Sequence, residues 1–361
     1  NPNKYTRRQG SRVMDVQDQE ESTQNVTVAT QDGVDMRFNS AEVTLDTDSP
    51  KEVDAFSKRY IEPAMSVLVS GIEADYIAYA TKATYNCAGT AGTALTNLLV
   101  PGLARAKLNQ GLAPKDGQRY IQGDSGSMAT LVNGLSGLFQ DSTQIKEQYR
   151  EGMLGRTAMA DWYENERMWS MTNIADVSGS TDADALVTDG GTTMDMHTDI
   201  VSPAVGSVFT VAGIYACHPE TKAAYPVLQQ FTVVTTSAGA TITVSPATYL
   251  TGAKKNMSSS TGADLNVASF NAQVVTFVGL ASSSYVNPLM YHKEAFQFVT
   301  ADLPIMDDAA KGVTKTMDDL SMRFWMASDI RNDELLMRID ILYGMAALRP
   351  EWASRLIGAK S

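Results

Sequence analysis

Residues 26–38 alternate apolar and polar positions on both sides of Asp32-Gly33, a pattern that predicts a β-hairpin. A two-residue loop would place the apolar residues of the two strands on opposite faces. A three-residue loop, 31–33, places them on one face, with Gly33 in a left-handed bulge position. We therefore predict the three-residue loop.

The apolar positions that follow recur at helical spacing. Ser49-Pro50-Lys51-Glu52 is a capping box with proline at the first helical position, and the apolar stripe continues to about Ala80. Pro63 lies within this stretch and lacks the amide hydrogen that a helix uses. We expect one long helix whose hydrogen-bond ladder is interrupted near Arg59.

The pattern is less regular in the middle of the chain. Helical spacing over 93–110 predicts a second helix, which is expected to break at Pro101-Gly102. Residues 111–170 combine short elements with glycine-rich turns. Residues 178–193 are rich in Ser, Thr, Asp and Gly, which predicts a linker.

Four β-branched runs of alternating pattern come next, and they are typical of a small barrel or sandwich. They are residues 208–217, 227–236, 240–244 and 274–280. From Met290 to Ala353 the chain returns to mixed strands. We predict an α+β fold in which residues 200–285 form an inserted, small β-barrel-like module.

Residues 1–25 are polar, with basic side chains first and acidic side chains after them. Such a segment is either a flexible tail or an arm that becomes ordered on another subunit, where each charged part meets the opposite charge. The candidate intersubunit contact residues are Arg7, Arg8, Arg12, Asp18, Glu20 and Glu21. Because the chain begins at Asn1 rather than Met, an upstream or targeting segment is left open.

Composition narrows the classes of function. The 361 residues are 43% hydrophobic and 19% charged, enough apolar surface for a sizeable core. Against 29 Lys and Arg stand 41 Asp and Glu, a net charge of -12 that opposes a general nucleic-acid-binding face. The two cysteines give neither a disulfide framework nor zinc spacing, so a reduced cytosolic environment is expected. No apolar run is long enough to predict membrane insertion.

One segment resembles the nucleophile segment of trypsin-like serine proteases. Gly123-Asp124-Ser125-Gly126-Ser127 would make Ser125 the attacking group. In those proteases the histidine precedes the serine, whereas the first histidine here is His197. We interpret the segment as a glycine-rich surface turn.

Asp195, His197 and Asp199 alternate, so a strand would direct all three to one side, as metal ligands could be. No second ligand cluster is evident, and we predict no metal site. Other candidates are interpreted as structural: a turn at His218, a solvated strand edge at His292, and solvated carboxylates at Asp307-Asp308 and Asp318-Asp319. Phosphate-loop and dinucleotide motifs are absent from the sequence, so no cofactor is predicted.

The C-terminal part resembles one family. The segments are residues 287–296, 322–325, 329–333, 338–344 and 349–351, with weaker similarity at 209–213, 218–219 and 228–231. They look like the closing segments and inserted-domain strands of tailed-phage coat proteins of the Salmonella phage P22 type. Those proteins have the Hong Kong 97 fold.

The resemblance implies a division into domains. Residues 1–25 would be the remnant of the extended loop, 26–90 the peripheral domain with the hairpin and spine helix, and 91–199 the axial domain. Residues 200–285 would be the inserted domain, and 286–361 the return to the axial and peripheral domains. The sequence departs from the family at its front, where the N-terminal arm is not present.

The function implied is that of a major capsid protein, not an enzyme. Such a subunit forms the pentamers and hexamers of an icosahedral shell around double-stranded DNA, with scaffolding and portal proteins as further partners, no membrane, and assembly in the host bacterial cytoplasm. Two alternatives are a nanocompartment shell of the same fold with protein cargo and a serine hydrolase centred on Ser125. The inserted module would stabilise the subunit or display a binding face; we favour stabilisation. Because like-charged subunits repel, assembly is expected to strengthen with salt.

Overall fold

The computed structural model is an α+β architecture, as predicted, in two compact units. Unit 1 comprises residues 1–23, 78–295 and 349–361, and unit 2 comprises residues 24–77 and 296–348. The structure describes residues 5, 7–8, 10, 12–14, 16–18, 23–39, 57–135, 155–174, 177–183, 185–198, 200, 203–236, 241–305, 311–317 and 320–358.

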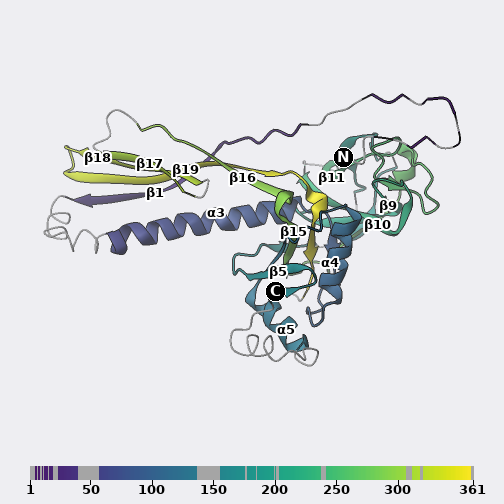
Figure 1. Ribbon diagram of the computed structural model, residues 1–361, viewed down its shortest axis with the longest axis horizontal. Coiled ribbons are helices and arrows are strands. Elements are labelled where there is room, and N and C mark those ends of the chain that lie inside the picture. Colours follow the sequence, from purple (N-terminus) through teal and green to yellow (C-terminus); the bar gives the residue numbers. More distant parts are fainter. Residues whose placement is uncertain are drawn as a thin grey trace. The chain divides into compact units, whose positions relative to one another are not determined.

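Unit 2 is an antiparallel sheet with a helix packed on one face (Figure 1). Its strands are β1 (Thr30–Asn39), β19 (Glu334–Ala347), β18 (Leu320–Asp329) and β17 (Lys311–Met317) in that order, with β16 (Phe296–Ala301) also paired to β19. The helix is α3 (Glu62–Ala83), which buries Leu68 and Ile72 against Ile339 and Ile341 of β19. Alternation in β19 places these isoleucines on one face of the sheet.

The predicted hairpin around Asp32-Gly33 is wrong. β1 is one continuous strand, and Asp32 and Gly33 pair with Ile341 and Asp340 of β19. A side chain at Gly33 would lie 2.6 Å from the carbonyl oxygen of Ile339, so the glycine permits close strand contact rather than a turn. The distant strand β19 supplies hydrogen-bond partners along all of β1, which a local pattern could not show.

The long predicted helix is present with different limits. A π-helical turn (Ser57–Ile61) precedes α3, so the hydrogen-bond ladder changes near Arg59, as Pro63 led us to expect. Pro63 is the second residue of α3, where no intrahelical partner for its amide is needed. The helix ends at Ala83 rather than near Ala80, and the capping box at 49–52 lies outside the described residues.

Helix α4 (Leu99–Gln110) is shorter than predicted and does not break at Pro101-Gly102. Pro101 is its third residue, a position whose amide has no intrahelical acceptor. The amide of Gly102 donates to the Leu98 carbonyl at 2.9 Å, so the ladder begins normally.

A second sheet forms the core of unit 1 together with α4 and α5 (Ser125–Leu135). Its order is β2 (Cys87–Ala88), β20 (Ala353–Leu356), β15 (Leu289–His292), β3 (Arg119–Gly123), β5 (Ala160–Glu164) and β4 (Arg156–Thr157). A separate pair consists of β6 (Ser170–Thr172) and β14 (Ser284–Val286). Short 3-10 turns are η3 (Val267–Phe270), η4 (Lys293–Ala295) and η5 (Pro350–Trp352).

The remaining strands of unit 1 form the β module, residues 178–277. The order is β7 (Ser178–Ser180), β13 (Val274–Phe277), β9 (Val208–Cys217), β10 (Ala224–Thr236), β11 (Thr241–Thr248) and β8 (Gly191–Asp195), with β12 (Met257–Ser258) on β9. A bridge between Thr181 and Met196 joins the two ends of this order around a buried apolar core. The four predicted strands are confirmed, one of them (β9) with the predicted limits and three with shifted ends.

The predicted linker at 178–193 is wrong, because this segment belongs to the β module. Ser178–Ser180 pair with β13, and β8 pairs with β11. Ala185 and Val187, between them, are fully buried in the module's core. Two apolar residues are enough for this contact, so the average polarity of the segment conceals it.

No helix within the described ranges is both long and apolar enough to cross a membrane.

Candidate interfaces and the junction of the β module

The predicted contact residues of the arm are exposed where they are described. Arg7, Arg8, Arg12 and Asp18 all face solvent, and the Arg8 guanidinium donates to the Val13 carbonyl at 2.7 Å. Glu20 and Glu21 lie outside the described residues. The role of these side chains between subunits therefore stays a prediction.

The arm also exposes apolar side chains that the sequence reasoning did not single out. Val13, Met14 and Val16 are 76%, 79% and 77% exposed. The signal was visible, since these three residues stand close together in an otherwise polar segment. Exposed apolar side chains in a short run are typical of a surface that another chain covers.

Helix α3 is apolar on two sides. One side packs on the sheet of unit 2, whereas Met65 and Val69, which share a face, are 40% and 45% exposed, and Val67, on another face, is 67% exposed. A helix with apolar residues on both sides is usually enclosed on both. The exposed apolar residues of α3 are therefore a second candidate interface.

The β module is joined to the core of unit 1 by side chains of β10. Gln230 accepts a hydrogen bond from the Cys87 amide at 2.9 Å and donates one to the Cys87 carbonyl at 3.1 Å. Thr232 donates from its hydroxyl to the Lys82 carbonyl at 3.0 Å. Gln230 thus satisfies both backbone groups of Cys87 as a neighbouring strand would.

Arg355 of β20 lies at the centre of this junction and is fully buried. Its guanidinium donates to the Gly206 carbonyl at 2.5 Å, to the Thr232 hydroxyl at 3.1 Å and to the Lys82 carbonyl at 3.2 Å. No carboxylate within the described ranges pairs with it. Burial lowers the pKa of Arg355 to about 10 because the cation is desolvated.

The glycine at 206 is required by this arrangement. Gly206 has φ +91°, and a Cβ there would lie 2.8 Å from the Trp169 ring. The same ring lies 5.9 Å from the Arg355 guanidinium carbon. Gly206 therefore allows its carbonyl and Trp169 to approach the cation together.

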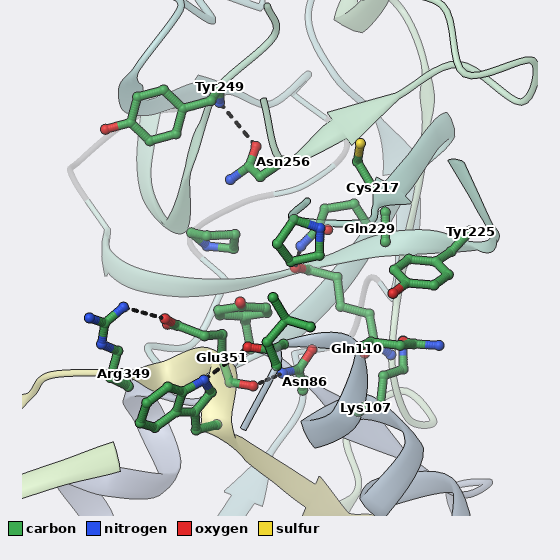
Figure 2. A pocket seen from close by; sticks show the side chains of 18 of the residues that line it. Asn86, Lys107, Gln110, Cys217, Tyr225, Gln229, Tyr249, Asn256, Arg349 and Glu351 are labelled. Carbon is green, nitrogen blue, oxygen red and sulfur yellow. Dashed lines mark hydrogen bonds and ion pairs between the residues drawn. The ribbon is translucent and has the colours of Figure 1, made fainter. Parts of the chain in front are cut away.

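A cavity of about 380 Å³ lies beside the junction, within unit 1 (Figure 2). Residues at the end of α4 and the segment 349–352 line one side, and strands of the β module line the other. Arg349 and Glu351 pair at 3.4 Å on its wall. Burial raises the pKa of Glu351, and the neighbouring Arg349 opposes this shift.

Ser125 is the first residue of α5, rather than part of a surface turn alone. The Asp124 carboxylate accepts from the Ser127 amide at 3.0 Å, which is an N-cap. The Ser125 amide donates to Glu166 at 3.2 Å. These contacts give the Gly-Asp-Ser-Gly-Ser motif a local role in starting a helix.

The alternating Asp195 and His197 contribute to the β module. The Asp195 amide donates to the Ala185 carbonyl, and the His197 amide donates to the Ser180 carbonyl. Asp199 and the pairs at 307–308 and 318–319 lie outside the described residues. In the part of the chain that the structure describes, no three His, Cys, Asp or Glu side chains gather as metal ligands would.

The predictions for the two other histidines, His218 and His292, had different outcomes. The turn at His218 is confirmed, because its Nδ1 accepts from the amides of Glu220 and Thr221. The solvated strand edge at His292 is wrong: the residue is 1% exposed, and its Nε2 lies 3.1 Å from Asp116. His292 is the last residue of β15 and pairs with Arg119 of β3, and it is covered by Trp352, whose ring centre is 5.4 Å away.

Comparison with known proteins gives one family match. Residues 182–358 match the family model described as "P22 coat protein - gene protein 5". No curated protein sequence matches the chain. The match confirms the predicted resemblance over these residues, and the mixed helices and strands confirm the α+β class.

Solved phage structures resemble the chain weakly. A structure described as "Mycobacterium phage Che8" has a TM-score of 0.43 and 9% identity, covering 93% of this chain and 76% of that one. The "Capsid structure of the Cyanophage P-SCSP1u" has a TM-score of 0.40 and 12% identity, covering 95% and 78%. Both scores are below 0.5, so the assignment rests on the family match.

Proposed function

We propose that this chain, whose residues 182–358 match the P22 coat protein family model, is a phage capsid protein that assembles into the pentamers and hexamers of an icosahedral shell enclosing double-stranded DNA. The family match carries the proposal. Scaffolding and portal proteins would be its partners, and assembly would take place in the host bacterial cytoplasm. The role is structural rather than enzymatic.

Two exposed apolar surfaces support self-association. Val13, Met14 and Val16 on the arm and Met65, Val67 and Val69 on α3 would be covered by neighbouring subunits. The charged residues Arg7, Arg8, Arg12, Asp18, Glu20 and Glu21 would add local pairing at the arm. Since each subunit carries a charge of -12, salt should strengthen assembly.

We propose the domain division given above, except that residues 178–199 belong to the β module, which stabilises the subunit. Support comes from Arg355, whose guanidinium donates hydrogen bonds to Gly206 and Thr232. Both residues belong to the β module. Without the module, the Arg355 cation of β20 would lose two of its three oxygen acceptors, a costly arrangement for a buried charge.

Electron microscopy of the purified full-length chain tests the main proposal. Closed shells with packaged nucleic acid support a capsid, and shells with protein cargo support a nanocompartment. Discrete monomers or small oligomers under every buffer condition would contradict both. Loss of a hydrolytic activity in Ser125→Ala would support the enzyme alternative instead.

The arm can be tested within the same assay. Replacing Val13, Met14 and Val16 together by Ser should prevent shell formation, because neighbours lose apolar contact area. The matched control replaces Val234, Val267 and Val274, three exposed valines of the β module, by Ser. Equal effects of the two triple variants would contradict a specific role of the arm.

A further inference from the structure

The cavity beside the junction is a feature that shell formation does not explain. Its volume of about 380 Å³ falls within the range of small-molecule sites. Tyr225, Tyr249 and Trp352 give it partly apolar walls, and amide side chains such as Gln110 and Gln229 add polar groups. This mixture is typical of a ligand site rather than of a packing defect, since empty cavities are usually apolar.

The charges that line the cavity are unbalanced. They are three cations, Lys107, Lys254 and Arg349, against one acid, Glu351, so the lining is positive by two charges. Glu351 is already paired with Arg349. A positive cavity is notable in a chain with a net charge of -12. It would attract an anion.

Lys107 is the cation with the clearest need for a partner. No hydrogen bond or ion pair to its ammonium group comes from the described residues. Gln110, one helical turn further along α4, also lines the cavity and lies beside Lys107 in Figure 2. An ammonium group and an amide on one helix face can donate together to one oxyanion.

We propose that this cavity binds an oxyanion, a phosphate or a carboxylate group, between Lys107 and Gln110 of α4 and the facing wall of the β module. The bound anion would bridge two parts of unit 1 and stabilise them together. The proposal is independent of shell formation. A lysine in the last turn of a helix also interacts favourably with the helix dipole, and the experiment separates that role from ligand binding.

The experiment measures the melting temperature of the full-length chain while inorganic phosphate replaces chloride at constant ionic strength. We expect a rise of about 2–4 °C when phosphate exceeds its dissociation constant tenfold. Lys107→Met should abolish the rise, and Lys107→Arg should keep it. Lys115→Met, at an exposed lysine outside the cavity, is the control and should respond as the unaltered chain does.

A second measurement replaces phosphate with a peptide of residues 14–22, whose carboxylates another copy of the chain could supply. A rise with phosphate alone identifies a free anion, and a rise with the peptide alone identifies a neighbouring chain; both need Lys107. An equal rise in the melting temperature of Lys107→Met, or no rise with either phosphate or the peptide, overturns the proposal. A dipole role alone would lower the melting temperature of Lys107→Met by the same amount with and without phosphate.

Discussion

Arg323 of unit 2 and Arg355 of unit 1 are both buried, but their charges are accommodated differently. In unit 2, Arg323 is 4% exposed and makes two hydrogen bonds to the Asp340 carboxylate, at 2.9 and 2.5 Å. In unit 1, Arg355 is fully buried and donates to backbone carbonyls and a hydroxyl. One cation is neutralised, and the other is solvated by dipoles.

The difference shows what each arginine depends on. Arg323 and Asp340 are directly opposite on β18 and β19, so the pair forms as soon as two adjacent strands meet. The acceptors of Arg355 come from the end of α3, from residue 206 and from β10. That cation has all three of these acceptors only when the β module has folded onto the core, so Arg355 couples the two. Variants that remove the partners separate these two cases.

The largest effect is expected for Asp340→Ala. It leaves the Arg323 cation buried without a counterion, which should cost about 3–5 kcal/mol. Native-state hydrogen exchange at β18 and β19 amides measures the loss for unit 2 alone. Asp35→Ala, which breaks the exposed pair with Arg338, is the control. A loss no larger than that of the control would mean that Arg323 recovers solvent or another acceptor.

Arg355→Met should cost less, about 2–3 kcal/mol, because the charge is removed together with its donors. What remains is a set of buried acceptors without donors and a smaller side chain. The loss should appear as faster exchange of amides in both β10 and β20, since the residue couples them. Arg349→Met, at a half-exposed arginine, is the matched control. Faster exchange in β20 alone would contradict the coupling.

Thr232→Val tests the same coupling, and it should lower the free energy of unfolding by about 1–2 kcal/mol. The hydroxyl both donates to Lys82 and accepts from Arg355, and valine keeps the shape without either bond. The exposed Thr236 of the same strand provides the control, Thr236→Val. In a double-mutant cycle with Arg355→Met the two losses should not add. Additive losses would show that the two side chains act independently.

The sequence predicted elements whose signal is local. The run 208–217 forms β9 with the predicted limits, because alternating β-branched residues describe a half-buried strand wherever it pairs. The same alternation at 26–38 gave the wrong topology. Alternation indicates an extended chain but does not identify the strand with which it pairs. Pairing with β19 is formed in place of a local turn at Asp32-Gly33.

The junction could not be predicted from sequence for a related reason. Arg355 is a charged residue in a short run of small and apolar residues, and the sequence does not show that its guanidinium is buried. Its acceptors come from three distant segments. His292 was misjudged in the same way, since Trp352 and Asp116 cover it from elsewhere in the chain. By contrast, Val13, Met14 and Val16 of the arm stand close together in the sequence, so an exposed apolar run there is predictable from sequence alone.

The smallest expected effect concerns the exposed pair of Asp35 and Arg338, with side chains 64% and 47% exposed. The hydrogen bond from Arg338 holds the pKa of Asp35 below its ordinary value of 3.8. Because the folded-state pKa is the lower one, the pair stabilises the chain above pH 3.8 and loses this effect as the pH falls through the folded value. Solvent screening limits the contribution to under about 1 kcal/mol.

Asp35→Asn should therefore lower the stability of unit 2 slightly at pH 7, and the difference should vanish in acid and shrink in high salt. Denaturation curves between pH 2 and 7 measure it, with Asp302→Asn at another exposed aspartate as the control. A difference that persists in acid would mean that Asp35 acts through packing in β1 rather than through its charge. The buried Arg323–Asp340 pair should show no comparable dependence on salt, since buried pairs are screened much less.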